Sequence, residues 1–81
     1  MTVEASVAVV TVLFFGKVAD QFGRQRQVEL PAGGCTVADL RRLLGLSQPG
    51  VRASIDRQIV GEAAVVGPGA EVAFFSLFSG G

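Results

Sequence analysis

The pattern of apolar and polar positions along this chain predicts both strands and helices. Residues 7–15 (VAVVTVLFF) and residues 71–78 (EVAFFSLF) are β-branched and aromatic, with apolar side chains on both parities. Such runs are typical of strands covered on both faces, and therefore central in a sheet. Residues 26–30 (RQVEL) alternate polar and apolar and predict a half-buried edge strand. Residues 53–60 (ASIDRQIV) predict two short strands joined by a bend at Asp56–Arg57.

Two segments carry helical spacing. In GKVADQFG, Val18 and Phe22 are four residues apart and a glycine follows, which predicts a short helix. In CTVADLRRLLGL, Thr36 precedes Asp39 by three residues, as in a capping box, and Gly45 can end the helix. Between these ends runs one apolar stripe: Val37, Leu40, Leu43 and Leu44. This segment is predicted to be the main helix.

The order of elements indicates how they pack. It runs strand, short helix, strand, main helix, short strands, a Gly67–Pro68–Gly69 turn and a final strand. The two most apolar strands lie at opposite ends of the chain, and we expect them to be neighbours in one sheet. One main helix covers only one face of that sheet, so the other face exposes Phe side chains unless another molecule covers it.

Composition bounds the class of protein. The 81 residues predict one domain, and 49% of them are hydrophobic, which suits a rich core in a small fold. The formal net charge is zero, so the chain has no electrostatic footprint for nucleic acid or an anionic membrane. Its longest apolar run falls far short of the roughly 20 residues of a membrane span. Cys35 is the single cysteine, so no internal disulfide forms, and a cytoplasmic location fits.

The inventory of side chains excludes most catalytic chemistry. The chain has no His, Tyr or Trp, so neither a Cys–His or Ser–His nucleophile pair nor the usual Cys/His zinc site can form. Cys35 lacks a neighbouring base or second thiol, and we expect a small buried or loop thiol rather than a sulfur relay. Gly33–Gly34 lacks the Gly-Lys-Ser/Thr ending of a phosphate loop. Arg41 and Arg42 are expected on the solvated face of the main helix.

Three segments resemble one known family. VTVLFFGKVADQFG, TVADLRRLL and the terminal GAEVAFFSLFSGG are similar to the small subunit of molybdopterin synthase, the MoaD family of ubiquitin-like sulfur carriers. The resemblance covers residues 10–81. It implies an α+β fold of the β-grasp type: a mixed sheet with one main helix on one face and short accessory helices. The β-grasp domain would span residues 1–76, with residues 1–6 as a short extension, and residues 77–81 would form a tail.

The resemblance also implies a reaction at the chain end. An adenylating partner related to the ubiquitin-activating enzymes would join the Gly81 carboxylate to AMP from ATP, and sulfur transfer would give a thiocarboxylate. The large subunit would then pass this sulfur to a pterin precursor, forming the molybdopterin dithiolene. Gly80 and Ser79 belong to the tail that enters both active sites, where glycine permits close backbone approach. The chain is thus expected to bind no cofactor or metal, and to donate sulfur within a heterotetramer whose catalytic side chains lie on the large subunit.

Five apolar residues are candidates for contact with these partners. Phe15, Ile59 and Phe75 occupy positions similar to the partner-facing patch of the family, although core packing would also explain them. Leu77 and Phe78 lie at or beyond the end of the last strand, where the domain has little of its own to cover them.

The sequence departs from the family at several positions. Ser76 and Leu77 stand where the family often has two prolines, which would stiffen the root of the tail, and Phe78 stands where it often has Val. Ala19–Asp20 replaces a frequent Arg-Glu pair, so one basic partner contact is missing unless Lys17 supplies it. These changes alter the expected geometry of partner binding, while the class stays the same.

Two other functions stay open. The chain would also suit a sulfur carrier for thiazole and thiamine synthesis, although such chains are usually shorter. A ubiquitin-like modifier or interaction module would join Gly81 to a lysine of another protein without carrying sulfur. Lys17 is the only lysine, which argues against chain-building on this protein itself.

Overall fold

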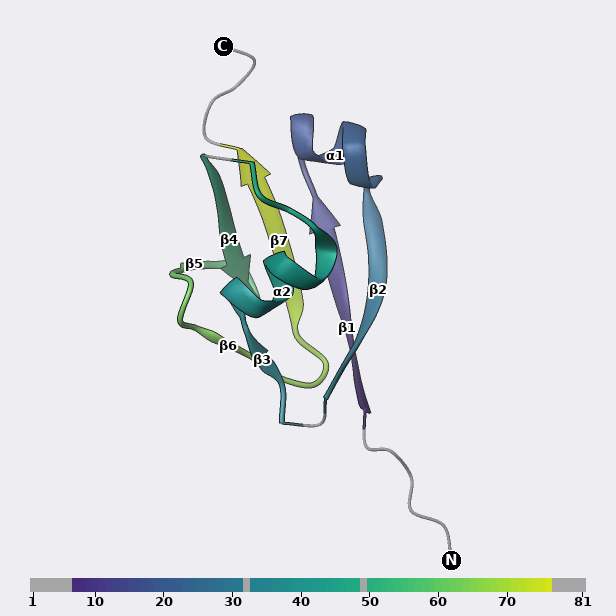
Figure 1. Ribbon diagram of the computed structural model, residues 1–81, viewed down its shortest axis with the longest axis vertical. Helices are drawn as coiled ribbons and strands as arrows, with labels where there is room; N and C mark the ends of the chain where they lie inside the picture. The colour runs from purple at the N-terminus through teal and green to yellow at the C-terminus, as the bar shows by residue number, and fades with distance from the viewer. Residues whose placement is uncertain (1–6, 32, 49, 77–81) are drawn as a thin grey trace, which may run out of the picture.

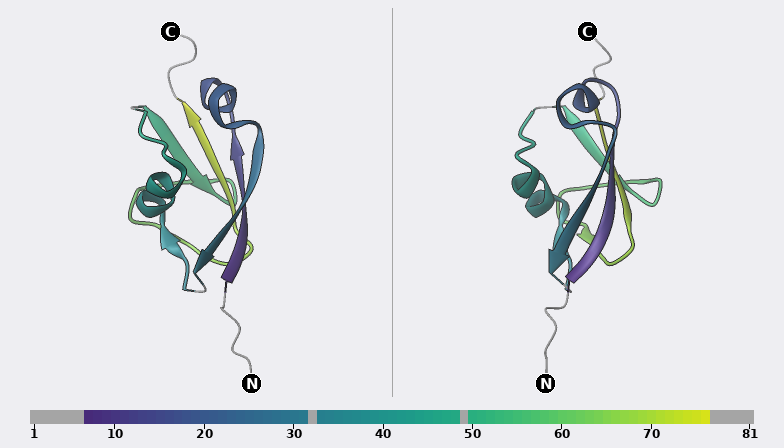
Figure 2. Two further views of the ribbon diagram at one scale, coloured as in Figure 1. Left: turned by 45° about the vertical axis from the view of Figure 1, so that its right-hand side comes forward. Right: turned by 90° about the vertical axis from the view of Figure 1, so that its right-hand side faces the viewer.

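The predicted α+β architecture of the β-grasp type is confirmed by a computed structural model, which describes residues 7–31, 33–48 and 50–76. The elements in chain order are β1 (Val7–Phe14), α1 (Lys17–Phe22), β2 (Gln25–Pro31), β3 (Cys35–Thr36), α2 (Val37–Leu44), β4 (Val51–Ile55), β5 (Gln58–Val60), β6 (Val65–Val66) and β7 (Glu71–Ser76). Five strands form one mixed sheet in the order β2-β1-β7-β4-β5. The helix α2 lies across one face of this sheet (Figures 1 and 2).

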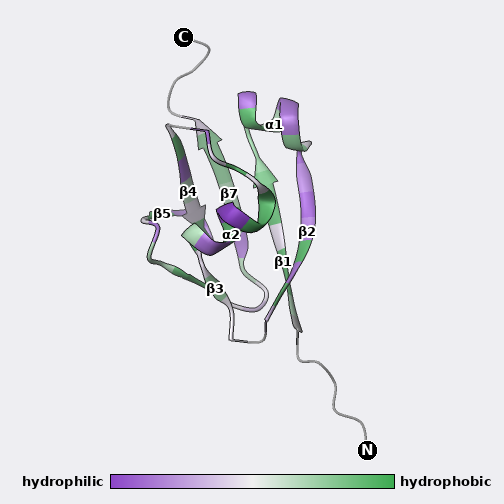
Figure 3. Ribbon diagram, in the orientation of Figure 1, coloured by the Kyte–Doolittle hydropathy of each residue, from purple (hydrophilic) through white to green (hydrophobic). Residues whose placement is uncertain are grey.

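The first and last strands are neighbours at the centre of the sheet, as the sequence predicted. They run parallel, with Val12 opposite Val72 and Phe14 opposite Phe74. The flanking pairs β1·β2 and β4·β7 are antiparallel. Figure 3 shows one reason why β2 lies at the edge: its upper half is hydrophilic, whereas β1 beside it is largely hydrophobic. Each residue of β1 is paired with β2, with β7 or with both, which places β1 inside the sheet.

The core lies between the sheet and α2. Phe14 is 2% exposed and its ring stacks against Phe22 of α1 at 5.3 Å and Phe74 of β7 at 6.2 Å between centroids. Each ring of this kind contributes about 2–3 kcal/mol through burial alone. The aliphatic residues buried around the rings include Val10, Val12, Val18, Leu30, Val37, Leu40, Leu46, Val66 and Val72.

The helix α2 begins and ends as its sequence predicts. The backbone N–H of Asp39 donates to Thr36 Oγ1 at 3.1 Å, which satisfies one of the free donors of the first turn. Gly45 follows the last turn with φ 75° and ψ 27°, the left-handed conformation that glycine adopts without strain. Of the predicted apolar stripe, Val37 and Leu40 are fully buried, whereas Leu43 is exposed. Leu44 is half-buried and packs against the core, so the stripe that contacts the sheet consists of Val37, Leu40 and Leu44.

A second, two-stranded sheet was not predicted from the sequence. Cys35 pairs with Val66 and Thr36 with Val65, antiparallel. The approach to this pair is close: Gly34 has φ +80°, and a Cβ added there would lie 2.2 Å from the Val66 carbonyl oxygen. Only glycine fits both conditions, which explains the second residue of the Gly33–Gly34 pair.

The prediction that both central strands are covered on both faces is wrong within this chain. On β1, the even-numbered residues 8–14 face the core, but Val9 is 47% exposed and Phe15, just after the strand, is 53% exposed. No element in the described part of the chain packs on this second face (Figure 2). We call it the open face. The alternative expectation, that a single helix leaves Phe side chains uncovered, is the one that holds.

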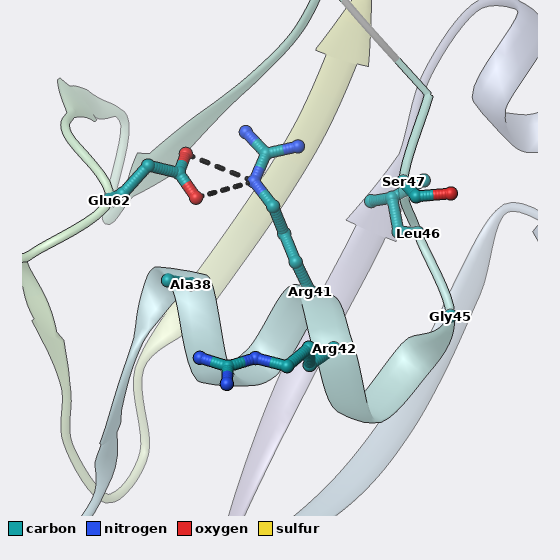
Figure 4. A pocket seen from close by; sticks show the side chains of 7 residues that line it. All are labelled: Ala38, Arg41, Arg42, Gly45, Leu46, Ser47 and Glu62. Carbon is teal, nitrogen blue, oxygen red and sulfur yellow. Dashed lines mark hydrogen bonds and ion pairs between the residues drawn. The ribbon is translucent and has the colours of Figure 1, made fainter.

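Arg41 does not lie on a solvated helix face, contrary to the prediction; Arg42 does. The side chain of Arg41 is 16% exposed, against 76% for Arg42. Arg41 Nε donates to both carboxylate oxygens of Glu62 at 2.8 and 3.0 Å (Figure 4), and Nη2 donates to the Val51 carbonyl oxygen. Its guanidinium carbon also lies 5.3 Å from the ring centroid of Phe74. Arg41 therefore connects α2 to β4, to β7 and to the loop after β5.

Replacement of Arg41 with Ala should lower the free energy of unfolding by about 2–3 kcal/mol, because it removes a charge-assisted hydrogen-bond set and a half-buried packing contact. Arg42→Ala is the matched control: it removes an exposed i,i+3 pair with Asp39 and should cost at most about 0.5 kcal/mol. Urea unfolding followed by circular dichroism measures both. Equal losses for the two variants would contradict the connecting role of Arg41.

Gly34→Ala should destabilise the fold by at least about 2 kcal/mol, since its Cβ would contact a backbone carbonyl and its φ is positive. Gly33→Ala is the control, because a Cβ at Gly33 meets nothing within 4 Å. The same unfolding measurement applies. A Gly34→Ala protein as stable as the Gly33→Ala protein would show that the contact with β6 is not retained in solution.

Candidate functional site

The candidate site is the end of the sheet at which β1 and β7 both finish. Because these strands are parallel, β7 ends at Ser76 close to the start of α1, at the opposite end of the molecule from the start of β1 (Figure 1). The Phe15 N–H donates to the Phe74 carbonyl oxygen at 3.0 Å, which holds the chain after β1 beside β7. Five predicted site residues lie outside the described residues: Leu77, Phe78, Ser79, Gly80 and Gly81.

The strand register aligns the residues of the open face in rows. In one row, Ile59 of β5 lies opposite Ser54 of β4, Ser54 opposite Ala73 of β7, and Ala73 opposite Leu13 of β1. Directly opposite residues share a face of a sheet, so this row crosses four strands on the open face. In the next row toward the end of β7, Arg52 lies opposite Phe75.

Two of the three described candidates for partner contact line one hollow. Phe15 and Phe75 border a cavity of about 360 Å³, together with Leu13, Ser54, Arg57, Glu71 and Ala73. Phe75 is half-buried, so core packing explains part of its position. Ile59, 64% exposed, lies on the same face beyond Ser54 and outside this hollow. Apolar side chains gathered in this way on a monomer surface are typical of a protein interface. That these three residues contact a partner stays a prediction.

Phe15 stands between this hollow and a second one. A cavity of about 440 Å³ is lined by Leu13, Phe14, Phe15, Gly16, Ala19, Arg24 and Gln25. Ala19, where the resembling family often has Arg, is half-buried and belongs to this lining. Lys17, the residue expected to replace that basic contact, is exposed at the first position of α1. The exposed Phe15 ring is thus accessible from two sides.

Two arginines of the open face were not singled out from the sequence. Arg52 and Arg57 are both exposed, and neither forms an ion pair within residues 7–31, 33–48 and 50–76. Arg57 adopts φ 73° in the Asp56–Arg57 turn and lines the first hollow. Successive residues of a strand point to opposite faces, so the burial of Ala53 in the core implies that Arg52 lies on the outer face. That Arg52 lies beside Phe75 is known only from the pairing of β4 with β7.

Another hollow lies on the helix side of the sheet. It measures about 340 Å³ and is lined by Ala38, Arg41, Arg42, Gly45, Leu46, Ser47 and Glu62 (Figure 4). Its principal charged groups, Arg41 and Glu62, already bond to each other, and Arg42 bonds to Asp39. This hollow therefore has no free charge to offer a ligand, and we place the candidate site on the open face.

Cys35 has the character of a structural thiol. It is half-buried in β3, and burial, followed by the charge of Asp39, raises the pKa of the thiol. A raised pKa keeps the thiol protonated near neutral pH, which lowers its nucleophilicity. Among the described residues, no cluster of three or more His, Cys, Asp or Glu side chains could hold a metal ion. No helix in this part of the chain is both long and apolar enough to span a membrane.

Comparison with known proteins agrees with the fold and gives the family. The structure is similar to the crystal structure of SAMP1 from Haloferax volcanii, with 20% sequence identity and a TM-score of 0.74, over 91% of this chain and 100% of the other. It is also similar to the solution structure of the Haloferax volcanii HVO 2177 protein, with 20% identity and a TM-score of 0.79, over 100% of this chain and 93% of the other. The third is the crystal structure of Haloferax volcanii small archaeal modifier protein 1, with 19% identity and a TM-score of 0.72, over 85% of this chain and 97% of the other. At these identities the likeness concerns the fold, which is that of the ubiquitin-like β-grasp proteins. No curated protein sequence matched the chain.

The family follows from the sequence model that matches residues 12–81: the chain belongs to the ThiS family. This makes it a ubiquitin-like protein of the class that comprises sulfur carriers of the ThiS/MoaD type and ubiquitin-like modifiers. Such proteins work through activating enzymes and partner proteins. The match includes the whole predicted tail through Gly81.

The rate of Cys35 alkylation by iodoacetamide should be lower than that of free cysteine at pH 7–8, because the raised pKa leaves less thiolate. The rate should keep rising above the pH at which free cysteine levels off. Intact mass spectrometry at timed intervals measures the reaction, with the urea-unfolded protein as the reference. Faster alkylation of the folded protein would contradict the assignment of a structural thiol.

Proposed function

We propose that this protein is the sulfur-carrier small subunit of a molybdopterin synthase. The observation that carries the proposal is the continuity of the family match through Gly81, on a fold whose last described strand ends beside an uncovered apolar face. The opening segment LFFGKVADQFG, which resembles the small subunit of that enzyme, supports molybdopterin over other sulfur-carrier pathways.

In this proposal the reactive group is the main-chain carboxylate of Gly81. A carboxylate is a poor electrophile, so an adenylating partner first uses it to attack the α-phosphorus of ATP, releasing pyrophosphate and forming an acyl-adenylate. A sulfur donor then displaces AMP and leaves a thiocarboxylate. The large subunit directs that sulfur to the pterin precursor. The described side chains include no nucleophile–base pair, so these steps take place with groups supplied by the partners.

The folded domain then serves to position the tail. Five extended residues, 77–81, span at most about 17 Å, so the domain must dock close to the entrance of each partner's active site. The open face includes the end of β7, so a partner docked there would hold the residue from which the tail extends. Phe15, Phe75 and Ile59 would contact the adenylating enzyme and the large subunit in turn, and Leu77 and Phe78 would contact the entrance itself.

A ubiquitin-like modifier is the second candidate. The likeness to a Haloferax volcanii protein described as small archaeal modifier protein 1 favours it, and that likeness covers 85% of this chain. A modifier would form an amide between Gly81 and a lysine of another protein. A sulfur carrier for thiazole synthesis belongs to the same family class and differs only in the acceptor of the sulfur.

One reaction separates these functions. The protein is incubated with ATP, the adenylating enzyme of its own organism and a sulfur source, and its intact mass is measured. A gain of about 16 Da marks exchange of oxygen for sulfur at the carboxylate. Conjugation to other proteins without this gain would favour the modifier. Restoration of growth in a molybdopterin-deficient strain, but not in a thiamine-deficient strain, would support the molybdopterin pathway.

A tail that ends one residue early or late should abolish sulfur loading. We expect no mass gain for the variant without Gly81 or for the variant with one alanine added after it, because both move the carboxylate by about 3.5 Å from the position that the partner's site receives. Cys35→Ser is the control and should load sulfur at the wild-type rate. Normal loading of the extended variant would refute the role of Gly81, and loss of loading in Cys35→Ser would point to a sulfur relay through the thiol.

A further inference from the structure

The arginines of this protein differ in whether they have an internal partner. On the helix side, Arg41 bonds to Glu62 and Arg42 to Asp39. On the open face, Arg52 and Arg57 have no carboxylate within ion-pair distance among the described residues. Glu71 lines the same hollow as Arg57, yet the two form no ion pair. Arg26, which lies opposite Val12 on the core side, also has no ion pair among the described residues, so Arg52 and Arg57 are distinguished by their place beside Phe75 and its hollow.

These two arginines flank the apolar part of the open face. Arg52 lies directly opposite Phe75 in the strand register. Arg57 lines the cavity of about 360 Å³ that Phe15 and Phe75 also line. Ser54, only 8% exposed, also lies in the lining, between the two arginines along the chain. An apolar centre with a charged rim is the usual anatomy of a protein–protein interface, in which Arg is enriched.

The geometry points to a partner of particular chemistry: we propose that Arg52 and Arg57 receive carboxylate side chains of the adenylating enzyme, around an apolar contact with Phe15 and Phe75. The inference rests on the proposed function, because it concerns docking before activation of Gly81. A protein fits this face better than a nucleic acid or a membrane, since two arginines beside exposed phenylalanines form no extended basic stripe and the net charge is zero. Guanidinium groups bind carboxylates in paired hydrogen bonds, which selects one orientation of docking.

Rim charges act mainly on the rate of association and make it sensitive to salt. The full-length double variant Arg52→Glu/Arg57→Glu should associate with the immobilised adenylating enzyme about tenfold more slowly than wild type at about 0.05 M salt. The difference should shrink to about twofold at about 0.5 M salt. Arg42→Glu is the matched control, because it changes one exposed arginine to the same residue on the helix side and should stay within about twofold of wild type.

The milder variants Arg52→Gln and Arg57→Gln keep the proposal testable if the double reversal does not fold, which circular dichroism reports. Each should slow association about two- to threefold at low salt, with the same salt dependence. Wild-type rates for both Gln variants, or a loss in the double variant that salt does not reduce, would overturn the inference.

The mass gain of the wild-type protein separates this inference from the proposed function. If wild type gains sulfur while the arginine variants associate normally, the docking inference fails and the sulfur-carrier function stands. If wild type binds the enzyme in an arginine-dependent manner but gains no sulfur, the docking inference stands and the carrier function fails. Absence of wild-type binding overturns both.

Discussion

The structure depends on the parallel pairing of β1 with β7. The two strands come from opposite ends of the described chain, so their pairing closes a long loop, and apolar burial on both strands must offset the entropy of that closure. Phe14 and Phe74, opposite each other in this pair, are both at most 2% exposed and stack within the core. Parallel direction has a further consequence: both strands end at the same edge of the sheet, and this edge carries the candidate site.

A single helix on one side of a five-stranded sheet leaves the other side uncovered. The same pleat that directs Val10, Val12 and Phe14 into the core directs Val9 and Leu13 to the open face. The monomer covers the apolar groups there only in part: Val9 is 47% exposed, and Leu13 and Phe75 are half-buried. With zero net charge to keep copies apart, such a face is a liability unless a partner covers it. The class of carriers and modifiers, whose members work through partner proteins, accounts for its retention.

The arginines differ in the internal contacts that they make. Arg41 spans the gap between α2 and the strands and satisfies Glu62, the Val51 carbonyl oxygen and the face of Phe74 at once. The methylene groups of such a long side chain can cover part of a small core while its charged end keeps its hydrogen bonds. Arg52 and Arg57 perform no such internal task. Arg41 therefore contributes to folding, and the contribution of Arg52 and Arg57 to recognition is the part that we propose.

The sequence by itself determined the elements whose causes are local. Thr36 and Gly45 bound α2 through capping, residues 56–57 form the bend between β4 and β5, and Gly67–Pro68–Gly69 separates β6 from β7. Apolar density in β1 and β7 also sufficed to predict their adjacency. The short β3–β6 pair escaped prediction, because two residues carry no detectable period. Only the tertiary structure decided that Arg41 is half-buried while Arg42 is solvated, and that Phe15, Phe75, Arg52 and Arg57 lie on one face. These outcomes depend on which strands pair and in what register, and that register is set by contacts between residues distant in the chain.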